Sequence, residues 1–173
     1  MVKIKVVAIL IGVLLMVLTL AYFYMGGFKP ISTRLTDCSQ INLIGVDFVG
    51  TPQDKKIGKH FQMVEEARED NPLHTIYYKE PEGKRDTLHV FIGYEPNNLK
   101  EDRVVKPWSH KTILCTQAIV ARLEMNRFVM PGPEKTKKEI LAFAMEQGLE
   151  LEGIFIDKII SNDYVEVWAP IKP

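Results

Sequence analysis

The sequence predicts an α+β domain behind a single transmembrane helix. The domain contains two strand–helix–strand–strand units, which we expect to form one antiparallel sheet with both helices on one side. Three observations predict this: an uncharged apolar run at the N-terminus, segments that recur at one constant offset, and alternating strand-like and helix-like apolar spacing. The expected domains are an anchor over residues 1–31 and a second domain over 32–173, with repeat halves at about 32–96 and 111–173.

The N-terminal apolar run extends from Val6 to Phe28 and contains no charged residue. Its 23 residues would form a helix of about 34 Å, and the hydrocarbon core of a bilayer is about 30 Å thick. A cleaved signal peptide is the alternative, but its apolar core is usually shorter and ends at a small-residue cleavage site, which does not follow here. We therefore expect residues 6–28 to lie in the lipid bilayer as an uncleaved anchor. Lys3 and Lys5 precede this run, and the small excess of positive charge favours an N-terminus inside and a domain across the membrane.

Two pairs of segments indicate an internal repeat. DTLHVFIGYEP (86–96) aligns without gaps with DYVEVWAPIKP (163–173), which begins 77 residues later. CSQINLIGVDF (38–48) aligns with CTQAIVARLEM (115–125) at the same offset. Two matches at one offset predict a duplicated unit.

The two halves have the same order of predicted elements, with residues 97–110 as the loop that joins them. The first half is predicted to contain a strand at 41–50, an amphipathic helix at 52–70, and strands at 73–81 and 86–96 around the turn PEGK. The second half is predicted to contain one long strand at 112–125, a helix at 134–150, and strands at 153–161 and 163–173. The second helix should bury Ile140, Leu141, Ala144 and Met145 and end at Gly148.

Strand alternation assigns the side chains to the two faces of the sheet. We expect the helices to cover Leu88, Val90 and Ile92 of the first half and Val165, Val167 and Ala169 of the second. The opposite, free face then forms a shallow groove that contains His89, Phe91, Tyr164, Glu166 and Trp168. Either Tyr77 or Tyr78 should join them, because alternation alone does not fix the register.

Glu166 lies between two aromatic residues on this predicted face. A carboxylate beside aromatic rings suits a cationic or amphipathic ligand, and each ring adds about 0.5–2 kcal/mol of cation–π attraction. Partial burial should raise the pKa of the Glu166 carboxyl. The alternative is that Glu166 is simply solvated, with Tyr164 and Trp168 packed against a loop.

Composition and spacing argue against several other functions. The 22 basic and 22 acidic residues cancel, and no helix-turn-helix precedes the domain, so we expect no nucleic-acid partner. The histidines and cysteines lack metal-site spacing and no nucleotide-binding motif occurs, so we expect no metal and no cofactor. Cys38 and Cys115 occupy equivalent repeat positions, but the sequence leaves open whether they pair.

The C-terminal segment YVEVWAPIK (164–172) resembles the closing strand of the GyrI-like small-molecule-binding family, also called the AraC-type effector-binding domain. IYYKEP (76–81) is similar to its aromatic strand and acid–Pro turn, and LHVFIG (88–93) to its Leu-x-x-x-Val-Gly strand. An apolar run followed by GGF is similar to anchored bacterial members. The resemblance implies a ligand groove between the two units, with Glu166 contacting cationic drugs. His89 and Phe91 depart from the Arg and acid that members often have.

Together these observations predict a membrane-anchored binding module for small amphipathic or cationic molecules. Its domain is expected on the extracytoplasmic side of a bacterial cytoplasmic membrane. The resemblance also implies an alternative, because some relatives hydrolyse reactive cyclopropane-containing compounds and Glu166 could serve as a general base. Glu166 has no evident catalytic partner in the sequence, so we expect that the protein is not an enzyme. A scaffold whose groove takes a partner protein is the third possibility.

Overall fold

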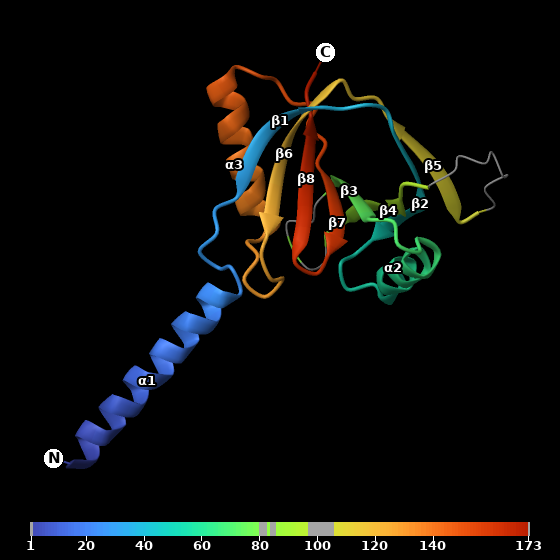
Figure 1. Ribbon diagram of the computed structural model, residues 1–173. Coiled ribbons are helices and arrows are strands. Elements are labelled where there is room, and N and C mark those ends of the chain that lie inside the picture. Colours follow the sequence, from blue (N-terminus) through green and yellow to red (C-terminus); the bar gives the residue numbers. More distant parts are fainter. Residues whose placement is uncertain (1, 80–82, 84–85, 97–105, 173) are drawn as a thin grey trace.

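In a computed structural model, the chain forms a long N-terminal helix and an α+β domain (Figure 1). The structure describes residues 2–79, 83, 86–96 and 106–172. The elements are α1 (Val2–Tyr24), β1 (Ser32–Asp37), β2 (Ile41–Gly50), α2 (Lys55–Ala67), β3 (Leu73–Lys79), β4 (Leu88–Tyr94), β5 (Trp108–Ile113), β6 (Gln117–Glu124), α3 (Pro133–Gln147), β7 (Ile156–Ser161) and β8 (Tyr164–Pro170). Most of the predicted turn at 81–84 lies outside the described residues.

The strands form one eight-stranded sheet in the order β1-β6-β8-β7-β3-β4-β2-β5, and all neighbours are antiparallel. The units β2-α2-β3-β4 and β6-α3-β7-β8 repeat the same order and meet where β7 pairs with β3. The predicted α+β fold class with two strand–helix–strand–strand units is therefore confirmed.

The outer strands are exchanged between the two halves. β1 leads directly into β2 but pairs with β6, whereas β5 leads into β6 but pairs with β2. The prediction of one continuous strand over 112–125 is therefore wrong, because the chain leaves one half and enters the other at residues 114–116. The expected loop at 97–110 also ends early, since β5 begins at Trp108; residues 97–105 lie outside the described part.

A disulfide joins the two linkers that cross between the halves. Cys38 follows β1 and Cys115 follows β5, and their Cα atoms are 5.4 Å apart. The backbone N–H of Cys38 also donates to the carbonyl of Thr116 at 2.9 Å. The pairing that the sequence left open is thus present, at the point where the duplicated halves exchange strands.

The two helices cover one face of the sheet, each over its own half. Ile140 and Ala144 of α3 pack with Val167 and Ala169, and Val64 of α2 packs with the buried residues of β4. The predicted set of residues beneath the helices is confirmed, and α3 ends with Gly148 as its left-handed C-cap. Leu141 and Met145 are exposed, contrary to prediction, because the buried stripe of α3 is narrower and consists of Thr136, Ile140 and Ala144.

The N-terminal helix is long and apolar enough over Lys5–Tyr24 to cross a membrane, and it is the one helix among the described residues that meets this criterion. A signal sequence near the N-terminus would have the same character. The predicted apolar run ends at Phe28, but the helix ends four residues earlier, at Tyr24. It ends there because a turn follows and Gly26 takes a left-handed φ of 83°. The backbone N–H of Asn126 donates to the carbonyl of Met25 at 3.0 Å, so the domain contacts the end of α1.

Candidate functional site on the free face of the sheet

The face of the sheet that the helices leave free has an apolar centre. Leu43, Ile76, Phe91 and Ile156 form a buried cluster there, and Trp168 packs against it while remaining partly exposed. These residues come from five strands of both halves, so the cluster spans the junction between them. The free face therefore has its own small core.

Phe91 fills the floor of this face instead of projecting from it. Gly45 and Gly93 are paired across β2 and β4, and the ring of Phe91 lies over both glycines. A Cβ added at Gly45 would lie 2.7 Å from the Phe91 ring and 2.1 Å from the carbonyl oxygen of Ile92. The glycines thus provide the space that lets Phe91 become fully buried.

Glu166 also points to the free face, as alternation predicted, but its carboxylate is already engaged. The Tyr164 hydroxyl donates to Oε1 at 2.5 Å and the Trp168 indole donates to Oε2 at 3.0 Å, both from the same strand. Nε of Arg122, on β6, donates to Oε1 at 3.0 Å. Glu166 is only 6% exposed. The carboxylate is thus a buried acceptor for three donors, one of them a cation.

Burial alone would raise the pKa of Glu166, as the sequence led us to expect. The hydrogen bonds from Tyr164 and Trp168 and the charges of Arg122 and Lys158 outweigh burial and lower the pKa below its usual value. The expectation of a raised pKa is therefore wrong, and Glu166 is ionised at neutral pH. The hydrogen bond between Tyr164 and Glu166 also raises the pKa of the Tyr164 hydroxyl.

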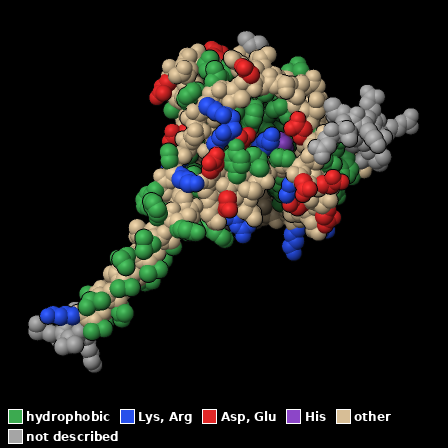
Figure 2. Space-filling view, viewed as in Figure 1, with side chains coloured by type: hydrophobic (Ala, Val, Ile, Leu, Met, Phe, Trp, Pro, Cys, Tyr) green, Lys and Arg blue, Asp and Glu red, His purple; other side chains and the backbone are tan. Residues whose placement is uncertain are grey.

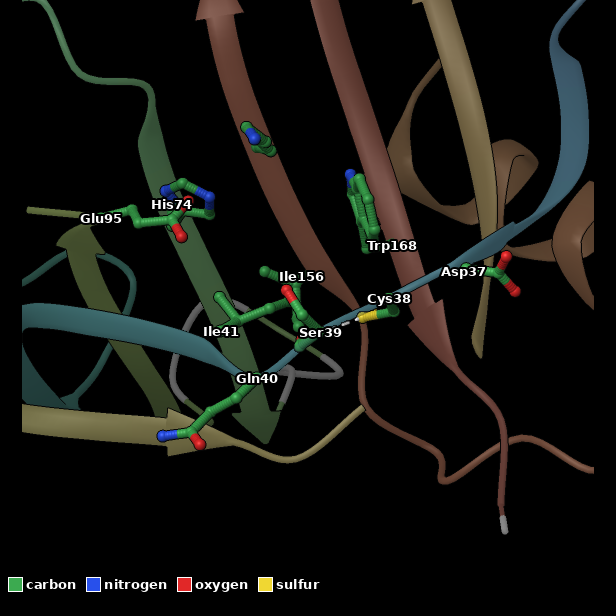
Figure 3. A pocket seen from close by; sticks show the side chains of 10 residues that line it. Asp37, Cys38, Ser39, Gln40, Ile41, His74, Glu95, Ile156 and Trp168 are labelled. Atoms are coloured by element: carbon green, nitrogen blue, oxygen red, sulfur yellow. Dashed lines mark hydrogen bonds between the residues drawn. The ribbon is translucent and has the colours of Figure 1, made fainter. Parts of the chain in front are cut away.

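Beside this cluster, a pocket of about 160 Å³ lies between the sheet and the linker that follows β1 (Figure 3). Trp168 and Lys158 lie on the sheet side, with the Lys158 ammonium 5.9 Å from the centre of the Trp168 ring. Cys38 and Ser39 bound the pocket from the linker, so the disulfide stands at its edge.

His74, on β3, completes one wall of this pocket. Its Nδ1 lies 3.1 Å from the carbonyl oxygen of Pro72, and because a carbonyl only accepts, Nδ1 carries the proton of the neutral ring. Burial, followed by the charge of Lys158, lowers the pKa of His74 to about 4. At neutral pH the imidazole is therefore uncharged, and Lys158 is the cation at this wall.

The other half of the free face carries a second group of charges and rings. The ring of His89 lies 4.8 Å from that of Tyr78, and its Nε2 lies 3.6 Å from Asp47. Lys111 lies 3.6 Å from the same carboxylate and 5.3 Å from the Tyr78 ring. A register shift in β3 between Tyr77 and Lys79 accompanies this placement. The choice between the two tyrosines is thereby settled: Tyr78 joins the free face, and Tyr77 packs with the helix-side core.

The sequence did not predict a role for Arg122, Lys158, Asp47 and Lys111. Arg122 and Lys158 lie directly opposite Glu166 on the two neighbouring strands. The signal that would have found them is a cross-strand charge pair, which requires the register of β6 and β7 against β8. Within the described residues, no group of three or more His, Cys, Asp or Glu side chains is arranged to hold a metal ion.

No family model matches the sequence, and no curated protein matches it significantly. Several solved structures resemble the fold. A hydrolase from Listeria innocua has 12% sequence identity and a TM-score of 0.61, and the match covers 87% of this chain and 98% of that one.

Two further solved structures are similar over most of the domain. The C-terminal domain of EcmrR has 9% identity and a TM-score of 0.58, with 82% of this chain and 98% of that chain covered. SAV2435 bound to tetraphenylphosphonium has 11% identity and a TM-score of 0.50, with 82% and 94% covered. At such low identities the likeness establishes a common fold, which is the α+β architecture implied by the resemblance.

Proposed function

We propose that this protein is a membrane-anchored module that binds small amphipathic molecules, cationic ones included, on the free face of its sheet. The observation that carries the proposal is the pocket beside Trp168, where a partly exposed indole and a buried apolar floor adjoin charged side chains. A structure of the same fold was solved with tetraphenylphosphonium, an amphipathic cation, which supports this choice of ligand class.

We assign the ligand contacts to the aromatic residues that remain accessible on this face. Trp168, Tyr164, Tyr78 and His89 are partly or well exposed and offer ring faces to an apolar or cationic body. Phe91 and Glu166 are buried, so their proposed role is to shape the floor and set the local charge. Tyr77 is left out of this set because it belongs to the helix-side core.

The size of the pocket limits how a ligand sits. Its volume of about 160 Å³ is smaller than the roughly 300–1,000 Å³ of typical small-molecule sites. We therefore infer that one part of the ligand enters beside Trp168 and the rest lies on the open face.

The hydrolase alternative receives less support from the chemistry of Glu166. Structures of this fold include proteins named as hydrolases. A general base at neutral pH works best with a pKa near neutrality and a free lone pair. Glu166 has a lowered pKa and accepts three hydrogen bonds, so it is a weak base.

We propose that α1 anchors the module in a bacterial cytoplasmic membrane, with the domain on the extracytoplasmic side. The length and composition of α1 support a membrane span. The Cys38–Cys115 disulfide supports the side, because disulfides persist outside the reducing cytoplasm.

The test is a calorimetric titration of the full-length protein with tetraphenylphosphonium and with tetraphenylborate, which have the same shape and opposite charges. We expect saturable binding of the phosphonium, and at least a tenfold loss of affinity in Trp168→Ala. Trp108→Phe is the matched control, because Trp108 packs with the helix-side core. If neither ion binds, or if Trp168→Ala binds as tightly as the parent protein, the proposal is wrong.

A further inference from the structure

We infer that the loop after β6, at Asn126–Phe128, is a second membrane contact that seats the domain on the bilayer surface beside α1. The inference rests on the proposed membrane anchor, and it is independent of the proposed ligand. The partner is the interfacial layer of the lipids, where headgroups meet acyl chains.

The loop is tied directly to the end of α1. The backbone N–H of Asn126 donates to the Met25 carbonyl, one residue beyond the last residue of the helix. Gly26 sits so close to Met125 that an added Cβ would lie 3.2 Å from the Met125 Cβ. The loop therefore contacts the C-terminal end of α1, at the level where this helix would leave the hydrocarbon core.

The conformation of the loop is fixed by Asn126. Its side-chain amide donates to Asp163 at 3.0 Å, at the turn between β7 and β8, and its amide oxygen accepts from the backbone N–H of Phe128 at 3.1 Å. Phe128 is 77% exposed, and the Arg127 guanidinium lies 4.9 Å from its ring. An exposed ring beside a cation suits the interface, where the ring enters the acyl boundary and the cation meets phosphates.

The depth of Phe128 is consistent with this role. Phe128 is two positions after Asn126 in the chain, so its Cα lies within about 8 Å of the Asn126 Cα. Interfacial segments bury their apolar side chains about 5–10 Å into the headgroup and acyl boundary. Tyr24 and Phe28 are also exposed at this level, and Figure 2 shows hydrophobic side chains continuing from the helix onto the adjoining base of the domain.

Seating the base of the domain orients the proposed groove. Tyr164 begins β8 next to Asp163, which binds Asn126, so this end of the free face lies nearer the bilayer than the Trp168 end. A hollow of about 550 Å³ between the end of α1 and Tyr164 opens at the same level. A ligand that partitions into the bilayer would reach the Tyr164 end first.

The experiment uses the full-length protein in phosphatidylcholine vesicles whose acyl chains carry bromine, which quenches tryptophan on contact. Phe128→Trp is compared with Leu114→Trp, each measured against the parent emission from Trp108 and Trp168. Leu114 is 73% exposed and lies beyond the opposite end of β6, whose 8 residues span roughly 25 Å. We expect bromine to remove at least half of the emission added at position 128 and to leave that at position 114 unchanged.

Flotation of the same vesicles separates the loop from the anchor. Flotation without quenching at position 128 would overturn the loop contact and leave the anchor standing. If the protein does not float, both the loop contact and the membrane anchor are overturned. Phosphonium binding measured in detergent would still test the proposed ligand site separately. Quenching that depends on the protein-to-lipid ratio would indicate a second copy at this surface and would also overturn the inference. Adding Arg127→Glu to Phe128→Trp should reduce the quenching at least twofold.

Discussion

Arg122 and Glu166 form an ion pair across β6 and β8, with Nε of the guanidinium 3.0 Å from Oε1 of the carboxylate. The pair neutralises the one buried acidic residue of the described free face. Under the proposed function, a cationic ligand would meet a carboxylate that is already compensated, and we expect its attraction to this face to depend mainly on the rings. The charge preference of the groove should accordingly respond to either partner of the pair.

Replacing Arg122 by Gln should increase the preference for a cation. The substitution removes the charge and leaves the hydrogen bonds from Tyr164 and Trp168 in place. The Glu166 charge then loses its ion-pair partner and is compensated only by the charge of Lys158. We expect the affinity ratio of tetraphenylphosphonium to tetraphenylborate to rise about tenfold, or about 1.4 kcal/mol. Calorimetry measures the ratio, and Arg68→Gln is the control, because Arg68 follows the last residue of α2 and pairs with Glu65 of that helix. An unchanged ratio would show that the pair does not set the charge preference.

Replacing Glu166 by Gln should shift the same ratio in the opposite direction. Arg122 is then left without its anionic partner, so the borate should gain relative to the phosphonium. Breaking a largely buried pair also leaves one charge poorly compensated, and we expect the free energy of unfolding to fall by about 1–3 kcal/mol. Chemical denaturation followed by circular dichroism measures the loss. Combining the substitution with Arg122→Met should restore part of it, and failure of that rescue would contradict the role of the pair.

The fold was predictable from the sequence because a duplication leaves its strand order visible twice. The offset of 77 residues that joins Cys38 to Cys115 also relates β4 to β8, and period-two alternation placed Glu166 and Trp168 without any knowledge of their neighbours. The exchange of β1 and β5 was not predictable. Pairing with the other half leaves the local pattern of a strand unchanged, so only tertiary contacts distinguish the two arrangements.

The electrostatics of the site could not be predicted for a related reason. Alternation states which side chains share a face, but Arg122 and Lys158 act on Glu166 because they lie directly opposite it. That placement depends on the register of three strands. Burial alone would have raised the pKa of Glu166. The hydrogen bonds from Tyr164 and Trp168 on its own strand, together with the charges of Arg122 and Lys158 opposite it, reverse the sign.

The lowered pKa of His74 predicts a specific loss of stability in mild acid. The unfolded chain binds a proton with a pKa of 6.5, whereas the folded chain binds it only near 4. Stability should therefore fall as the pH drops from 6.5 to 4, by about 3 kcal/mol, and stay level for this group below that. His74→Asn, which keeps a donor for the Pro72 carbonyl, should remove this loss in denaturation series between pH 7 and pH 4.

His110→Asn, at an exposed position of β5, is the matched control for this series and should retain the acid-dependent loss. Glu166 affects stability in a different pH range. Because folding lowers the pKa of its carboxyl, the stability that it contributes is present above the usual pKa of 4.5 and is lost only as the pH falls below that value. If the free energy of unfolding falls with pH equally in the parent and in His74→Asn between pH 6.5 and 4, His74 is not the titrating group.

Removing the disulfide should destabilise the domain and weaken its pocket together. The bond links positions 77 residues apart, so it restricts the unfolded chain strongly, and we expect the Cys38→Ser, Cys115→Ser double variant to lose about 2–4 kcal/mol of unfolding free energy. Because Cys38 and Ser39 bound the pocket beside Trp168, phosphonium affinity should fall as well. The parent protein under reductant provides the comparison and should match the double variant in both measurements. If reductant changes neither stability nor affinity, the crossing linkers are held by their backbone contacts and the disulfide adds nothing to the groove.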